Sequence, residues 1–182
     1  TGALEHHVAG RTLSHPNVHA LLVARDGHVW FGTGDGLDVL EPATGRVRHY
    51  RHSAGTTVAL PNNLVRSLHQ DARGRVWIGT QGGLAVAQPV GTGEWTLSRP
   101  LDADLPGQRG SIIFSLQEGP AGTLWAGTDA GLLRYRPDLH EARLFGLGDG
   151  LQDLEFNGGA AGRLSDGRLA FEALERHLAR HV

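Results

Sequence analysis

Histidine is the residue type in this sequence that could hold a metal ion, and it occurs 11 times. The histidines considered as ligands are His6, His7, His15, His19, His49 and His52. Zinc sites need ligands that converge, usually two at a short fixed spacing and two more elsewhere in the chain. These histidines share no repeated spacing and fall mostly on expected turns and strand ends. We therefore predict no metal site.

Carboxylates are the second group that could do chemistry, and Asp35, Asp38 and Glu41 lie close together in the sequence. Alternate residues of a strand share a face, so the three could converge only by way of turns. We interpret them as solvated turn residues. The sequence has no G-x-S-x-G nucleophile motif, and without Cys or Lys it excludes a thiol nucleophile, Schiff-base chemistry and a P-loop lysine. We predict no catalytic residue and no cofactor.

The composition narrows the class of protein. The chain has 182 residues, 40% of them hydrophobic, and a net charge of −2. A near-neutral chain without a basic stripe argues against a nucleic-acid partner. No apolar run is long enough to span a bilayer, so we expect no membrane segment in this chain.

A repeated motif provides the elements that must position any site. The pattern G-x-[VL]-W-x-G-T-x-x-G-L occurs at residues 27–37, 74–84 and 122–132, and its tryptophans are 47 and 48 residues apart. The second unit contains four short segments rich in β-forming residues, at 65–70, 75–80, 84–88 and 94–98, the third of them ended by Pro89. Four antiparallel strands every ~45 residues are typical of a β-propeller blade.

The repeats predict an all-β fold: a β-propeller fragment of about three and a half to four four-stranded blades, with a short C-terminal helical tail. The propeller spans residues 1–171, with units at about 13–50, 60–99 and 105–145 and a degenerate unit at 150–171, where Ala170 replaces the tryptophan. Residues 172–182 form the tail, because their apolar residues recur at helical spacing. Residues 3–7 match the outer strand of a preceding blade. We expect an open arc of blades rather than a closed ring.

The repeated residues themselves are expected to be structural. Trp30, Trp77 and Trp125 hold the same place in each unit, which favours packing between blades over ligand stacking. Glycine in a strand lets a neighbouring sheet approach closely, which is the role expected of Gly32, Gly79 and Gly127. The threonines that follow these glycines (33, 80 and 128) are expected to make structural hydrogen bonds.

These residues resemble the two-component regulator propeller repeat. The resemblance is carried by residues 60–65 and 71–84, which match the family's unit nearly position by position, and by the Glu-Phe-Asn run within 150–159. It implies the periplasmic sensor propeller of hybrid histidine kinases or diguanylate cyclases, with no catalysis in this chain. Two alternatives stay open: a propeller enzyme, such as a lyase or glycan hydrolase, and a pure protein-interaction scaffold.

Residues that vary between the repeats are the ones free to specify a ligand. The turns between second and third strands, and the loops that lead into the innermost strands, gather at one end of a propeller. The candidate ligand-binding residues there are Asp35, Asn63, Gln81, Arg109, Asp129 and Asn157, with Asn17 at the corresponding place in the first unit. The alternative is that Asn and Asp only satisfy turn backbone. We expect a small-molecule or glycan ligand, and as partners the remaining blades of the parent protein or a dimer partner.

Overall fold

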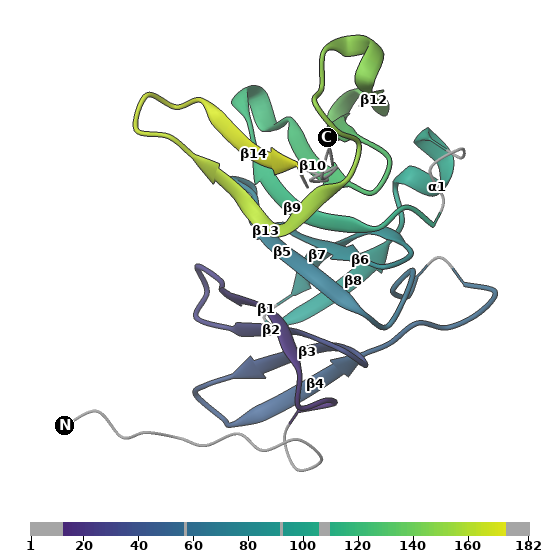
Figure 1. The fold of residues 1–182 in the computed structure, drawn as a ribbon. Coiled ribbons are helices and arrows are strands. Elements are labelled where there is room, and N and C mark those ends of the chain that lie inside the picture. The colour runs from purple at the N-terminus through teal and green to yellow at the C-terminus, as the bar shows by residue number, and fades with distance from the viewer. Residues whose placement is uncertain (1–12, 57, 92, 106–109, 174–182) are drawn as a thin grey trace, which may run out of the picture.

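The chain folds into four antiparallel β-sheets (Figure 1). The structure is a computed structural model and describes residues 13–56, 58–91, 93–105 and 110–173. The first sheet contains β1 (Val18–Val23), β2 (Val29–Thr33), β3 (Gly36–Glu41) and β4 (Arg46–Tyr50). The second contains β5 (Val65–Gln70), β6 (Val76–Thr80), β7 (Gly83–Gly91) and β8 (Glu94–Ser98). The third contains β9 (Ile113–Glu118), β10 (Leu124–Thr128), β11 (Leu132–Arg136) and β12 (Glu141–Phe145).

The fourth sheet has two strands in the described residues, β13 (Phe156–Arg163) and β14 (Leu169–Ala173). The helical elements are short: α1 (Leu101–Asp104) and the 3-10 turns η2 (Pro120–Gly122), η3 (Pro137–Leu139) and η4 (Leu147–Asp149). Each four-stranded sheet is a meander in which neighbours in sequence are neighbours in space. The innermost strands β1, β5, β9 and β13 follow one another side by side. The all-β propeller fragment predicted from the repeats is confirmed.

The G-T-x-x-G-L part of the motif forms the turn between the second and third strands. The hydroxyl of Thr80 donates to the carbonyl oxygen of Gly83 at 2.8 Å, and the first and third sheets repeat this bond. At Gly36 φ is +125°, and a Cβ there would lie 2.6 Å from the carbonyl oxygen of Tyr50. Only glycine fits such a position without strain, which explains why each repeat keeps it.

Tryptophans fill the wedges between consecutive sheets, as the sequence predicts. Trp30 is fully buried between the first two sheets and meets Trp95 of β8 edge to face, with ring centroids 4.7 Å apart. Trp77 is packed between the second and third sheets against Leu133 and Tyr135 of β11. In both wedges the outer strands of the following sheet cover the indole.

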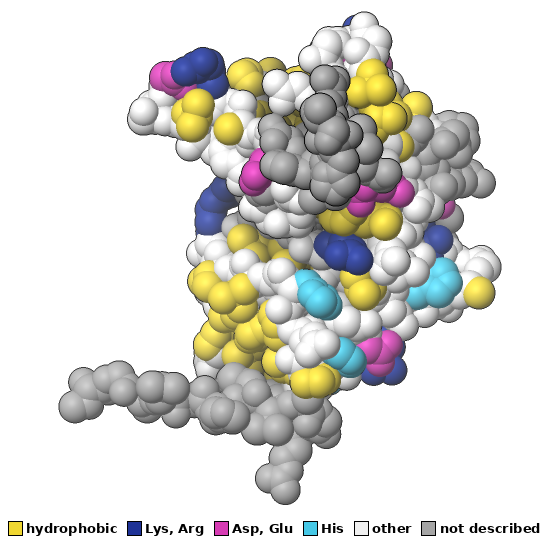
Figure 2. All heavy atoms as spheres, viewed as in Figure 1, with side chains coloured by type: hydrophobic (Ala, Val, Ile, Leu, Met, Phe, Trp, Pro, Cys, Tyr) yellow, Lys and Arg dark blue, Asp and Glu magenta, His cyan; other side chains and the backbone are white. Residues whose placement is uncertain are grey.

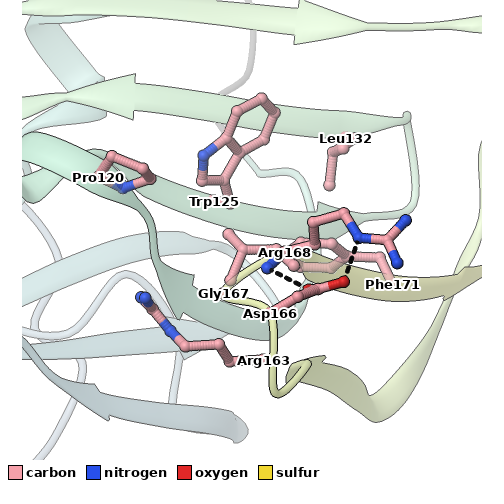
Figure 3. A pocket seen from close by; sticks show the side chains of 9 residues that line it. Pro120, Trp125, Leu132, Arg163, Asp166, Gly167, Arg168 and Phe171 are labelled. Atoms are coloured by element: carbon pink, nitrogen blue, oxygen red, sulfur yellow. Dashed lines mark hydrogen bonds and ion pairs between the residues drawn. The ribbon is translucent and has the colours of Figure 1, made fainter.

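Trp125 differs because the following sheet has no outer strands among the described residues. Its indole is half-buried and stacks on Phe145 of its own sheet, at 5.7 Å between ring centroids. A cavity of about 670 Å³ remains between Trp125 and Leu132 on one side and Phe171 on the other (Figure 3). This open wedge corresponds to the filled wedges around Trp30 and Trp77.

The opposite end of the arc is also open. Figure 2 shows hydrophobic side chains gathered over β1 and β2. Val18, Leu21 and Val23 of β1 are exposed there. In the second sheet the equivalent strand, β5, is instead packed against the first sheet.

Three predictions about individual segments need correction or fall outside the described residues. The strand predicted to end at Pro89 continues to Gly91, and Pro89 lies opposite Trp95. The pairing is irregular between Pro89 and Gly91, and proline is tolerated at such interruptions because no ladder hydrogen bond is lost. Glu172 and Ala173, predicted to start the helical tail, belong to β14. Residues 174–182 and the predicted outer strand at 3–7 lie outside the described residues.

The repeated strand glycines do let the next sheet approach, as expected. A Cβ built on Gly32 would lie 2.7 Å from Val65 Cγ1, and one on Gly79 would lie 2.7 Å from Ile113 Cγ2 and also meet Ser67 Oγ. A Cβ on Gly127 would lie 2.9 Å from Phe156 Cβ. In each case the side chain that approaches from the next sheet belongs to the first residue of its innermost strand: Val65, Ile113 or Phe156.

We expect Gly79→Ala to lower the free energy of unfolding by about 1–3 kcal/mol, because the added methyl group overpacks a rigid contact between two sheets. Gly148→Ala is the matched control, since a Cβ there meets nothing within 4 Å. Its effect should stay within about 0.5 kcal/mol. Urea unfolding of both variants measures the difference, and equal stabilities would contradict the close approach.

Candidate functional site

A β-bulge interrupts each of the first three innermost strands. Val18 and Ala20 pair with Thr33 and Gly32, so His19 between them is an extra residue. The same shift leaves Arg66 extra in β5 and Phe114 extra in β9. A bulge re-aims the side chain of its extra residue, and bulges are over-represented beside active sites. In each of these three blades, the bulge therefore takes one side chain out of the regular alternation between the two faces of the sheet.

A cavity of about 220 Å³ opens among the innermost strands of all four sheets. We call it the channel cavity. Its lining is contributed by residues 19–21 of β1, 66–68 of β5, 115–117 of β9, and Gly159 and Ala161 of β13. Two bulge residues, His19 and Arg66, are part of this lining. The third, Phe114, lies against Arg66, with 5.5 Å between the guanidinium carbon and the ring centroid.

The channel cavity is cationic and offers free hydrogen-bond donors. None of its described lining residues is Asp or Glu. The Nε atom of Arg66 is buried and has no hydrogen-bond partner among the described residues, and the same holds for Ser115 Oγ. His19 is exposed. A guanidinium without a carboxylate partner is suited to hold an anionic or strongly polar ligand group.

His69 lies near the channel cavity on β5, and its Nε2 has no hydrogen-bond partner among the described residues. Burial lowers the pKa of His69 from 6.5, and the carboxylate of Glu118 opposes this only in part. The unfolded chain therefore binds the proton more readily than the folded protein. Stability is present above the ordinary pKa and is lost as the pH falls through it.

We accordingly expect the free energy of unfolding to fall between about pH 7.5 and pH 5.5, and His69→Leu to reduce this slope. His19→Leu is the control, because His19 is exposed. Urea unfolding at several pH values gives the slopes. A His69→Leu slope equal to that of the parent would refute the assignment.

The structure brings two of the predicted ligand-binding residues together. Asn63 Nδ2 donates to Asp35 Oδ1 at 3.0 Å, and Asn63 Oδ1 accepts the backbone N–H of His52 at 2.7 Å. The other oxygen of Asp35 pairs with Arg51 Nη2 at 2.9 Å. Asp35 follows β2 and Asn63 precedes β5, so this pair ties together the loops of consecutive sheets.

Among the described residues, the other predicted residues form no hydrogen bond or ion pair with Asp35 or Asn63. Asp129 Oδ1 accepts the backbone N–H of Ile112 at 2.9 Å, which is the turn-satisfying role weighed above. Gln81 is exposed, and its backbone N–H donates to Leu64. Asn157 is half-buried in β13, and Asn17 accepts the N–H of Gly34 through its carbonyl. Arg109 lies outside the described residues.

The bulge residues were missed by sequence reasoning, although a signal was present. Positions 19, 66 and 114 hold His, Arg and Phe, while Val, Val and Ile precede them. Variation directly after a repeated apolar residue marks a position outside the packed interface. Only loop positions were considered, because a bulge depends on strand pairing and has no motif of its own.

Asp38 was predicted to be a solvated turn carboxylate, and this is wrong. Its side chain is fully buried under Ser14 and His49. Ser14 Oγ and His49 Nδ1 each lie 2.6 Å from Asp38 Oδ1, and Ser14 Oγ is 3.1 Å from the same Nδ1. In a catalytic triad the imidazole lies between the other two, with Nε2 on the serine. Here the Ser14 hydroxyl and the Asp38 carboxylate both contact Nδ1 of His49, so the cluster differs from a catalytic triad.

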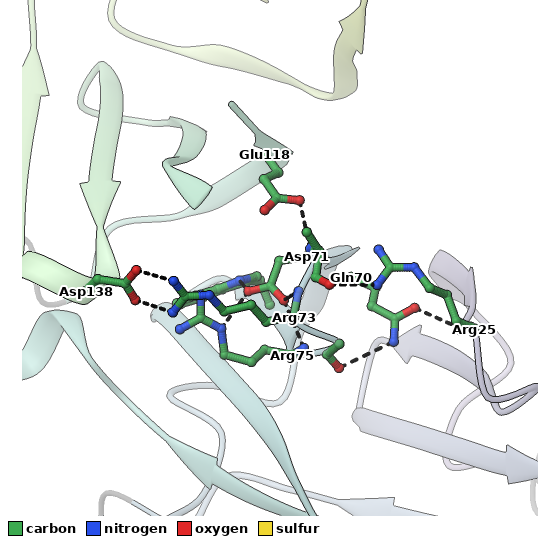
Figure 4. A network of polar contacts seen from close by, with 10 residues as sticks. Arg25, Gln70, Asp71, Arg73, Arg75, Glu118 and Asp138 are labelled. Atoms are coloured by element: carbon green, nitrogen blue, oxygen red, sulfur yellow. Dashed lines mark hydrogen bonds and ion pairs between the residues drawn. The ribbon is translucent and has the colours of Figure 1, made fainter. Parts of the chain in front are cut away.

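Polar contacts join the sheets at the turns between first and second strands (Figure 4). The backbone N–H of Arg25 donates to Gln70 Oε1, and that of Ala72 donates to Glu118 Oε2, both at 2.9 Å. Arg73 makes a two-pronged ion pair with Asp138. The first sheet is thereby fastened to the second, and the second to the third, where the innermost strands β5 and β9 end.

Two further properties of the described ranges bear on the site. They contain no group of three or more His, Asp or Glu side chains that could hold a metal ion. None of their helices has the length and hydropathy that a membrane crossing requires.

Comparison with known families identifies the repeat. A model of the family "Two component regulator propeller" matches the chain twice, at residues 12–35 and 59–82. These segments cover the first halves of the first and second sheets. No curated protein sequence matches the chain significantly.

Solved structures share the fold. Two extracellular domains named for hybrid two component systems of B. thetaiotaomicron align with TM-scores of 0.75 and 0.65 at 18% and 17% identity. The alignments cover 92% and 85% of this chain but only 22% and 19% of those chains. An inactive virginiamycin B lyase from Staphylococcus aureus, solved with quinupristin, aligns at 18% identity with a TM-score of 0.60, covering 86% of this chain and 48% of the lyase. Two segments of the chain are therefore similar to the two component regulator propeller repeat, and the chain has the fold of a β-propeller fragment.

Proposed function

We propose that this chain is part of the periplasmic sensor region of a bacterial two-component or diguanylate cyclase signalling protein. In this proposal it binds a small-molecule or glycan ligand and catalyses no reaction. The family match supports the signalling context, and so does the shared fold with extracellular domains of hybrid two component systems. The remaining blades of the parent protein, or a dimer partner, would cover the open apolar face of β1.

The observation that carries the proposal is the repeated bulge. Three sheets share their tryptophans, glycines and turns, yet their bulges carry three different side chains. His19 and Arg66 line the channel cavity, and Phe114 lies against Arg66. A scaffold without a ligand has no need for this difference. Function on a repeated framework is placed where the repeats differ.

Binding is favoured over catalysis by the contacts of the described nucleophiles. In the Ser14–His49–Asp38 cluster the serine hydroxyl donates directly to the carboxylate, and the imidazole does not lie between the two as it does in a catalytic triad. The lyase alternative rests on a fold that several functions share, and fold alone does not assign a reaction.

A ligand screen tests the proposal. Thermal shift with a library of glycans and small metabolites should find compounds that raise the Tm of the parent protein. His19→Trp, which places a larger ring at the cavity rim, should abolish the shifts. Val58→Trp is the control, because Val58 is exposed and does not line the channel cavity.

Two results would contradict the proposal. Hits that stabilise His19→Trp as strongly as the parent would place binding elsewhere. Hits that are chemically converted during incubation, as seen by NMR of the small molecule, would favour the propeller-enzyme alternative.

A further inference from the structure

We propose that the channel cavity binds a small anionic ligand, and that Arg66 holds its carboxylate or sulfate group. The inference deepens the proposed function and rests on it. It concerns the chemical class of the ligand, and a failure here would leave a sensor for a neutral ligand intact.

The placement of Arg66 is the first step. The bulge in β5 turns its side chain to the cavity, and the ring of Phe114 on β9 supports the guanidinium at 5.5 Å. A stacked guanidinium is already ordered, so a ligand that pairs with it loses less side-chain entropy on binding. Arg66 is therefore arranged as a preformed anion site.

The absence of a competing carboxylate is the second step. Six other arginines of the described residues form ion pairs with acidic side chains, and Arg66 is not among them: Arg51, Arg73, Arg75, Arg136, Arg143 and Arg168. Arg66 forms no ion pair within the described ranges, and its buried Nε lacks a partner there. A buried donor that stays unpaired costs free energy, which a bound anion would recover.

The neighbouring groups fit the same ligand. His19 adds a ring N–H donor, and Ser67 and Ser115 bring hydroxyl groups to the lining. Ser67 Oγ is already engaged with the carbonyl oxygen of Ile113, whereas Ser115 Oγ is unpartnered among the described residues. The lining thus supplies donors and positive charge and no described carboxylate.

The size of the channel cavity limits the ligand. Its volume of about 220 Å³ is below the roughly 300–1,000 Å³ of sites that take drug-sized molecules. A single sugar ring with one acidic group fits this class, and so does a free sulfate. Both ligands carry an anionic oxygen group that Arg66 can bind, and the titrations described next distinguish the acidic sugar from free sulfate.

Isothermal titration calorimetry with glucuronate, glucose and sodium sulfate tests the inference. We expect the parent protein to bind glucuronate, and to bind glucose about tenfold or more weakly, because the charge-assisted bond is lost. Arg66→Ala should weaken glucuronate binding by a similar factor, and Arg66→Lys should restore part of it. If sulfate binds as tightly as glucuronate, the anion alone is the ligand; if it binds more weakly, the sugar ring contributes.

Arg134→Ala is the matched control. Arg134 of β11 also lies over a phenylalanine, Phe145, at 5.6 Å, but it does not line the channel cavity. The Arg134→Ala variant should bind glucuronate as tightly as the parent protein. Circular dichroism of each variant confirms that the fold is kept.

Two results would overturn the inference. One is that neither glucuronate nor sulfate binds the parent protein, and the other is that Arg66→Ala binds them equally well. The proposed function has its own test: a neutral library hit that His19→Trp abolishes would support the sensor while removing the anionic class.

Discussion

Replacing Trp77 with alanine is expected to lower the free energy of unfolding by about 3–5 kcal/mol. The indole is 2% exposed and packs against Leu133 and Tyr135 of the next sheet. It meets Tyr135 edge to face at 5.9 Å, and the guanidinium of Arg75 lies 5.1 Å from its ring. The surrounding strands are paired on both sides, so they cannot collapse into the space left by the ring.

Trp125→Ala is the matched control for this prediction. Trp125 occupies the same place in the repeat, but its indole is half-buried beside an open cavity (Figure 3). Less apolar surface returns to water when it is removed, so the loss should be clearly smaller than for Trp77. Urea unfolding followed by circular dichroism compares the two. Equal losses would mean that the wedge between the second and third sheets is not the packed core described here.

The second large effect is expected at Asp71. Its carboxylate is 2% exposed and accepts hydrogen bonds from Arg75 Nε at 2.6 Å and Trp77 Nε1 at 2.9 Å. It also accepts the backbone N–H groups of Arg73 and Arg75 at 3.0 Å. Asp71→Ala would leave the largely buried guanidinium of Arg75 without its counter-charge, and removing one partner of a buried pair costs about 3–5 kcal/mol.

Asp166→Ala tests whether burial causes the loss. Asp166 also accepts the backbone N–H and the Nε of an arginine, Arg168, but both side chains are largely exposed. Its removal should cost far less stability than the removal of Asp71, because exposed pairs are screened by water. Asp71→Asn, which keeps an acceptor for Trp77 but loses the charge, should fall between the two. If the Asp71→Ala variant were as stable as Asp166→Ala, the buried hydrogen-bond network around Asp71 would not contribute to stability as described.

The first sheet shows what the absence of this network looks like. Ala24 stands at the position of Asp71, and Trp30 Nε1 is buried without a hydrogen-bond partner in the described residues. Trp30 is nevertheless fully buried. Packing therefore places the tryptophan, and the aspartate of the second sheet adds to an arrangement that forms without it.

The sequence by itself determined the blade. The spacing of Trp30, Trp77 and Trp125 and the alternation of apolar residues specify four-stranded meanders, because a strand with one repeated apolar face must pack on a neighbour of the same kind. The glycine that enters each third strand and the threonine before that turn are local requirements of backbone geometry. Such requirements act over a few residues, so they can be read without knowing the rest of the fold.

Only the tertiary structure decided which side chains meet. The bulges that turn His19 and Arg66 to the channel cavity depend on pairing between strands, and the support from Phe114 comes from another sheet. Asp38 looked solvated because Ser14, which covers it, is 24 residues away in sequence. Trp125 holds the same position in the repeat as the other two tryptophans, yet its exposure depends on which strands of the following sheet cover its indole. Contacts between distant residues carry no local pattern, and this is why the repeat could be predicted while the candidate site could not.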